Sequence, residues 1–178
     1  MRAGGRAAPG TGPTVLALAA LLALVAAVPA AGRETIVRQH LDAGRVQFSG
    51  MDINGDGVAD SVRVDRIKQT LVYFVGDQRK GFRPFDPSSL PEEDRRFVPD
   101  TLLEKDLDGD EIEDLLLFNR EHLAKYAADE GTLRRIIASS VYLGQPRGAY
   151  VELQSAAPSE EARAAIVDRA RSLAFPSP

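Results

Sequence analysis

Two acidic stretches decide how this chain folds: residues 52–60, DINGDGVAD, and residues 106–114, DLDGDEIED. Each stretch places a side chain with oxygen ligands at its positions 1, 3, 5 and 9. A tight loop turns these alternate side chains toward one centre, where several carboxylates repel each other unless a cation offsets them. We therefore expect each loop to bind a hard cation such as Ca²⁺, which takes about six to eight oxygen ligands in proteins.

The remaining ligands are expected from the main chain and from water. Position 7 supplies a backbone carbonyl in such a loop, and this position is Val58 in the first loop and Ile112 in the second. The chain has no Cys, and neither loop contains His. The absence of soft ligands argues against Zn²⁺ or copper.

The second loop departs from the first at position 6, where Glu111 stands in place of Gly57. This position makes a sharp turn that glycine adopts easily, and a strained residue of another type costs about 1–3 kcal/mol. Against this cost, the second loop has aspartate at all four ligand positions, whereas the first has Asn54 at one of them. A solvated acidic turn without a metal remains the alternative for either stretch.

Strands are predicted after both loops, which argues against an EF-hand. That motif also needs an acid at position 12, where this chain has Arg63 and Leu117. An acid at position 9 followed by a strand instead resembles the calcium loops of FG-GAP and VCBS repeats, the blades of integrin-type and bacterial surface β-propellers. The two loops start 54 residues apart, a spacing within the range of such repeats.

The resemblance continues beyond the loops and covers roughly residues 45–153. It rests on residues 71–74 (LVYF), Gly76 and Gly81-Phe82 after the first loop, and on residues 141–144 (VYLG) and 148–150 (GAY) after the second. It implies Ca²⁺ ligation by Asp52, Asn54, Asp56 and Asp60, and by Asp106, Asp108, Asp110 and Asp114.

The expected fold is mainly β (α+β), with two β-hairpin units, each led by a calcium loop, and with flanking helices. Propellers close with about four to eight blades, so two blade-like units are too few for a closed ring. Either the two units pack face to face or several chains associate.

The first 30 residues have the pattern of a signal peptide. Arg2 and Arg6 precede a 14-residue apolar run at residues 15–28, and small residues favour cleavage before Ala31. The run is shorter than the roughly 20 residues of a membrane-spanning helix. We expect an exported protein, periplasmic or extracellular, without membrane insertion after cleavage; an uncleaved anchor is the alternative.

The charge balance limits the classes of partner. The formal net charge is −4, and it becomes −6 without Arg2 and Arg6. The sequence contains no basic stripe, which argues against nucleic acid or an anionic membrane as the partner. Without Cys, an exported chain must rely on packing or on bound metal for stability.

The remaining sequence divides into four parts. Residues 31–44 are expected to form a short helix, because Ile36, Val37, His40 and Leu41 have helical spacing. Residues 45–99 hold the first loop and end in a Pro-rich linker at residues 82–99, and residues 100–154 hold the second loop and a helical insertion near residues 121–128. Residues 155–178 are expected to form a C-terminal helix capped by Ser159.

These features predict an exported, non-enzymatic Ca²⁺-binding module that presents a surface to an unidentified protein or glycan. They are also compatible with a homo-oligomer. No catalytic residue is assigned, because the sequence has no G-x-S-x-G, no H-E-x-x-H and no Cys. Two alternatives remain: an accessory envelope protein with vestigial metal loops, and a secreted hydrolase that uses carboxylates as acid and base.

Overall fold

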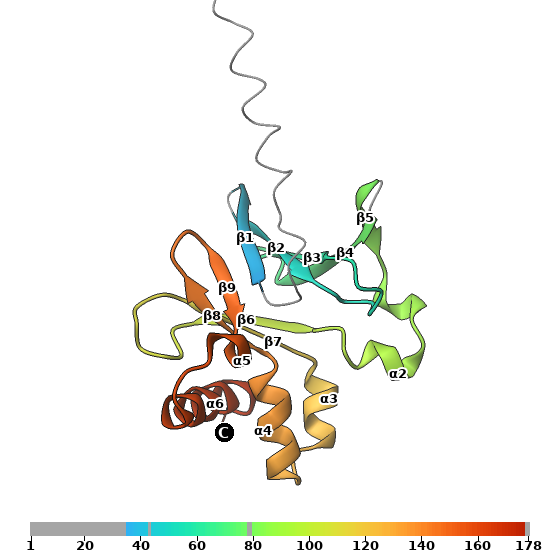
Figure 1. Ribbon diagram of the computed structural model, residues 1–178. Coiled ribbons are helices and arrows are strands. Elements are labelled where there is room, and N and C mark those ends of the chain that lie inside the picture. Colours follow the sequence, from blue (N-terminus) through green and yellow to red (C-terminus); the bar gives the residue numbers. More distant parts are fainter. Residues whose placement is uncertain (1–34, 43, 78–79, 177–178) are drawn as a thin grey trace, which may run out of the picture. The chain divides into compact units, whose positions relative to one another are not determined.

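A computed structural model describes residues 35–42, 44–77 and 80–176 (Figure 1). The signal peptide predicted for residues 1–30 lies outside these residues. Among the residues that are described, no helix combines the length and the apolar character needed to cross a membrane.

The structure is mainly β, as predicted, and its centre is one antiparallel sheet of nine strands. The strands lie in the order β5-β4-β3-β2-β1-β9-β8-β7-β6. Their bounds are β1 Thr35–Asp42, β2 Arg45–Met51, β3 Asp60–Asp65, β4 Thr70–Asp77, β5 Gly81–Phe85, β6 Thr101–Lys105, β7 Asp114–Phe118, β8 Val141–Gln145 and β9 Ala149–Glu152. We call β1–β5 the first half of the sheet and β6–β9 the second half.

The prediction of a helix at residues 31–44 is wrong, because Thr35–Asp42 form strand β1. This strand pairs with β2 on one side and with β9 on the other. Ile36 points into the core and is 1% exposed, whereas its neighbour Val37 is 45% exposed. The apolar spacing that suggests a helix is thus overridden by two strand partners, one of which lies far away in the sequence.

The two halves do not form separate units that face each other. They join edge to edge through the pairing of β1 with β9. They also share a core, because the ring of Phe48 in β2 lies 5.9 Å from that of Tyr150 in β9, and both side chains are buried.

The predicted Pro-rich linker at residues 82–99 is largely ordered structure. It begins within β5 and continues through a 3₁₀ turn, η1 (Pro87–Ser89), and one short helix, α2 (Glu92–Arg95). Pro84 is tolerated in β5 because this strand is at the edge of the sheet, where a missing N–H need not break the pairing.

The helical insertion is longer than predicted and comprises two helices, α3 (Arg120–Lys125) and α4 (Glu130–Ala138). The side chains of Asn119 and Asp129 cap them by accepting main-chain N–H groups. After β9 come α5 (Leu153–Ala156) and α6 (Glu160–Ala174), and Ser159 caps α6 by accepting the N–H of Ala162.

Helices α3, α4, α5 and α6 pack against the second half of the sheet (Figure 1). All five residues of β7 are buried, because Leu116 and Phe118 join the helix-side core while Leu115 and Leu117 join the core around Phe48. Such burial on both faces explains the continuous apolar run of this strand.

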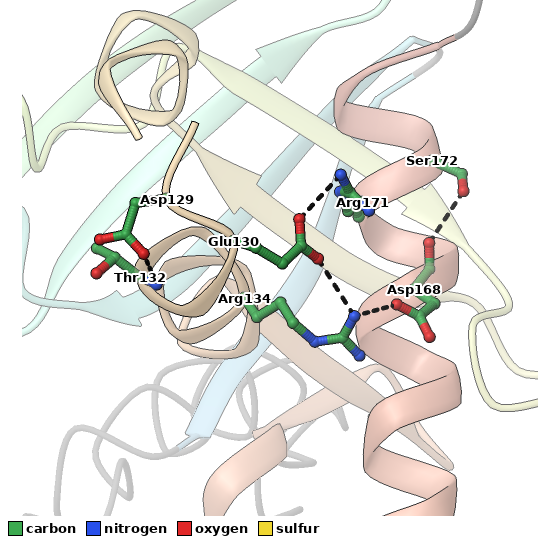
Figure 2. Close-up of polar contacts among 7 residues, drawn as sticks. All are labelled: Asp129, Glu130, Thr132, Arg134, Asp168, Arg171 and Ser172. Atoms are coloured by element: carbon green, nitrogen blue, oxygen red, sulfur yellow. Dashed lines mark hydrogen bonds and ion pairs between the residues drawn. The ribbon is translucent and has the colours of Figure 1, made fainter. Parts of the chain in front are cut away.

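Helices α4 and α6 are also linked by ion pairs at their surface (Figure 2). Arg134 in α4 lies 2.7 Å from Asp168 in α6, and Glu130 lies 3.0 Å from Arg171. Exposed pairs of this kind contribute about 0–1 kcal/mol each, so the buried apolar contacts dominate the attachment of α6.

We predict that Phe48→Ala lowers the free energy of unfolding by about 3–5 kcal/mol, because it leaves a cavity between the two halves. Urea unfolding should remain a single transition, since both halves share this core. Phe82→Ala is the matched control: this ring is 47% exposed, and its loss should change stability by no more than about 0.5 kcal/mol. Two separate transitions in the unmutated protein would contradict this account.

Candidate metal centre

The two acidic loops occupy equivalent places in the sheet. The first connects the antiparallel strands β2 and β3, and the second connects β6 and β7. In each case position 9 of the loop, Asp60 or Asp114, is the first residue of the following strand. All ten predicted ligand residues therefore lie in or next to two hairpin connections.

The same hydrogen bonds shape both loops. The side-chain oxygens at positions 1, 3 and 5 accept the main-chain N–H groups of positions 6, 5 and 7, respectively. The donor–acceptor distances are 3.1, 3.1 and 2.8 Å in the first loop, with the same values in the second. These bonds turn the alternate side chains of each loop inward.

Position 9 is the buried anchor of each loop. Asp60 is 0% and Asp114 1% exposed. One carboxylate oxygen accepts the N–H of position 2, at 2.7 Å for Asp60 and 2.6 Å for Asp114. The other oxygen accepts an N–H from the next strand, donated by Gly76 in β4 or by Gly144 in β8, at 2.7 Å in both cases.

Glycine is required at these two positions because the neighbouring backbone lies too close for a side chain. A Cβ atom on Gly76 would lie 2.2 Å from the carbonyl oxygen of Ala59, and one on Gly144 would lie 2.4 Å from that of Glu113. Any side chain would push the strand away from position 8 of the loop. The sequence contains both glycines as part of the repeat-like pattern, but their hydrogen bonds to the aspartates appear only in the structure.

Burial makes the charged form of the anchoring aspartates costly. It raises the pKa of Asp114 to about 6, although the N–H groups of Gly144 and Leu107 act in the opposite direction. Burial likewise raises the pKa of Asp60 and that of Asp108. A nearby cation would favour the ionised carboxylates.

Three carboxylates of the second loop meet closely enough to hold a metal ion. Each of Asp106, Asp108 and Asp114 offers an oxygen, and these oxygens lie within 4.8 Å of one another. All three donors are carboxylate oxygens, which suits a hard cation. Asp110 lies outside this group, and one of its oxygens accepts the N–H of Ile112, the residue predicted to contribute a carbonyl.

The first loop does not bring its acids together in this way. In the described part of the chain, the second loop contains the only set of three acidic or histidine side chains that meets so closely. Asp52, Asp56 and Asp60 supply the carboxylates of the first loop, with Asn54 between them and Val58 at position 7. The amide of Asn54 donates to Asp56 at 2.9 Å, an interaction that the aspartate at the same position of the second loop cannot make.

Helix α6 and strand β1 also contact the second loop. The guanidinium of Arg169 donates to the carbonyl of Leu107. Arg38 lies 3.6 Å from Glu113 and 3.3 Å from Glu104. No local sequence pattern predicts these two arginines, because both contacts join segments that are distant in the chain.

The chain matches no protein-family model, and no curated protein and no solved structure is significantly similar to it.

Position 6 adopts the left-handed conformation in both loops. The φ angle is 80° at Gly57 and 70° at Glu111. We predict that Glu111→Gly raises the free energy of unfolding by about 1 kcal/mol, because glycine adopts this conformation without steric cost. The measurement is urea unfolding in the presence of a chelator. Glu111→Ala is the control, since it removes the same charge but keeps the strain; an equal gain in this variant would assign the effect to charge.

Asp114 should make the metal-free protein less stable as the pH rises. A carboxyl whose pKa is raised in the folded state favours folding fully below its unfolded value, about 3.9, and loses that contribution as the pH rises through about 6. The loss is on the order of 3 kcal/mol. We predict that Asp114→Asn flattens this decline between pH 4 and pH 7, measured by urea unfolding with chelator; an unchanged slope would show that another group is responsible.

Proposed function

We propose that this protein is an exported, non-enzymatic Ca²⁺-binding module of the FG-GAP/VCBS type, in which the cation stabilises a surface that binds a protein or a glycan. The observation that carries the proposal is the set of three hydrogen bonds that the two loops share, in loops whose candidate ligand atoms are all oxygens. Export rests on the pattern of residues 1–30 alone.

The order of the strands supports a repeat of two blade-like units. Strands β2–β5 and β6–β9 are each four antiparallel strands that are neighbours in the sheet in chain order. Each run has an acidic loop between its first and second strand and a glycine in its third strand that donates to position 9. The α3–α4 insertion of the second run falls between its second and third strand.

The second loop is the stronger candidate for Ca²⁺. Its three closely spaced carboxylates provide a high negative charge density, which attracts a divalent cation and is relieved by it. A pre-shaped loop also loses less conformational freedom when it binds. The first loop has one amide in place of a carboxylate and should bind more weakly.

A thermal melt in chelator, in excess Ca²⁺ and in excess Mg²⁺ tests the proposal. At a Ca²⁺ concentration ten times the Kd, each site adds about 1.4 kcal/mol, so two sites should raise Tm by roughly 6–11 °C. Mg²⁺ should raise Tm by a smaller amount, because it requires a tighter octahedral shell of ligands. Asp108→Ala should remove the contribution of the second loop and Asp56→Ala that of the first.

Glu161→Ala is the control matched in charge, because this residue lies in the exposed first turn of α6. Its Ca²⁺-dependent shift should equal that of the unmutated protein. The absence of a Ca²⁺-specific shift would overturn the proposal and would favour an accessory envelope protein with vestigial loops.

A further inference from the structure

A pocket of about 350 Å³ lies between α2 and α3, and none of the residues that line it belongs to the loops at residues 52–60 and 106–114. Its lining includes buried Val98 and half-buried Tyr73. The hydroxyl of Tyr73 donates to the carbonyl of Pro99 at 2.7 Å, and Asn119 donates to that of Val98 at 3.0 Å. The pocket is therefore built on fixed groups, and its volume is that of a small ligand site.

The acidic side chains in this pocket are mostly engaged. Both oxygens of Asp100 accept the N–H of Arg120, at 3.1 and 3.2 Å, and one of them also accepts the hydroxyl of Thr101. Glu121 pairs with Lys125 at 3.3 Å. Glu92 and Asp100 form no ion pair with a described residue, but the oxygens of Asp100 already accept hydrogen bonds, whereas Glu121 is paired.

The cationic side chains, in contrast, are largely available. Arg95 and Arg96 line the pocket and form no ion pair with any residue that the structure describes. Arg96 stacks on the ring of Phe97, with its guanidinium 4.6 Å from the ring centre, a position that leaves the donor edge of the guanidinium open to a further partner. Arginine binds carboxylate and phosphate groups through two parallel hydrogen bonds.

His122 adds a donor to the same wall. Its ring lies 5.8 Å from that of Phe97 and 5.3 Å from that of Tyr126. Its Nδ1 atom is buried without a hydrogen-bond partner in the described chain. A proton on this atom would have no acceptor, so the neutral ring favours the tautomer with the proton on Nε2. Burial is the main cause that lowers the pKa of His122, and the positive charges of Arg96 and Lys125 act in the same direction.

From this surplus of unused donors we propose that the pocket between α2 and α3 binds a small ligand through one anionic group, a carboxylate or a phosphate. Arg95 and Arg96 bind the anion, and His122 donates a hydrogen bond to it. Glu92 weakens binding by repulsion. This site is separate from the acidic loops and does not depend on bound metal.

Titration of the purified protein by NMR, in chelator, with D-glucuronate, inorganic phosphate and neutral D-glucose tests the proposal. Saturable binding of glucuronate or phosphate, but not of glucose, is expected, and the stronger of the two anions identifies the preferred group. Arg95→Gln and Arg96→Gln should each weaken binding about tenfold or more, since each removes hydrogen bonds to a charged group. Glu92→Gln should tighten it several-fold.

Arg147→Gln is the control matched in charge, because Arg147 is exposed in the turn between β8 and β9. This variant should bind as the unmutated protein does. The proposal is overturned if neither anion binds saturably, or if Arg147→Gln weakens binding as much as Arg96→Gln, which would indicate non-specific attraction. Binding that is retained in chelator while the Ca²⁺-dependent shift in Tm is absent would leave this site standing and the metal proposal refuted.

Discussion

The buried aspartate at position 9 of each acidic loop is the interaction on which the arrangement of the sheet depends. Asp60 and Asp114 each join three segments: the start of the loop, the strand that they open, and the neighbouring strand that contributes a glycine. A buried carboxylate is costly unless its oxygens are paired. The N–H groups of the loop and of the glycine meet this need, and each would be left unsatisfied if the carboxylate were lost.

The same constraint explains why the loops are suited to a cation. The carboxylates of Asp106, Asp108 and Asp114 each accept a main-chain N–H of the loop and lie close together, so they repel one another when no cation is bound. The raised pKa values of Asp108 and Asp114 reflect this environment, with burial as the largest cause. A loop with this shape and charge has more to gain from a divalent cation than a flexible acidic turn has, and the proposed function rests on that difference.

The candidate metal residues are the part of the site that local spacing could predict. Oxygen side chains at positions 1, 3, 5 and 9, the glycines at the turns and the strands that follow are all visible as short-range patterns. The contacts of Arg169 with Leu107 and of Arg38 with Glu113 are not visible in this way. The pocket between α2 and α3 is not visible in the sequence either, because its two walls come from a segment that resembles a Pro-rich linker and from a helical insertion.

The two acidic loops, the mainly β character and the glycines that follow each loop can be predicted from the sequence, because they depend on the spacing of neighbouring residues. That residues 35–42 form a strand depends on long-range pairing, since Ile36 and its neighbours pair with β9 more than 100 residues later. The same long-range contacts place the two halves in one sheet and around one core at Phe48. Local periodicity measures which side of an element is apolar, whereas the partner that covers this side is chosen by long-range packing, and a single sequence does not reveal that choice.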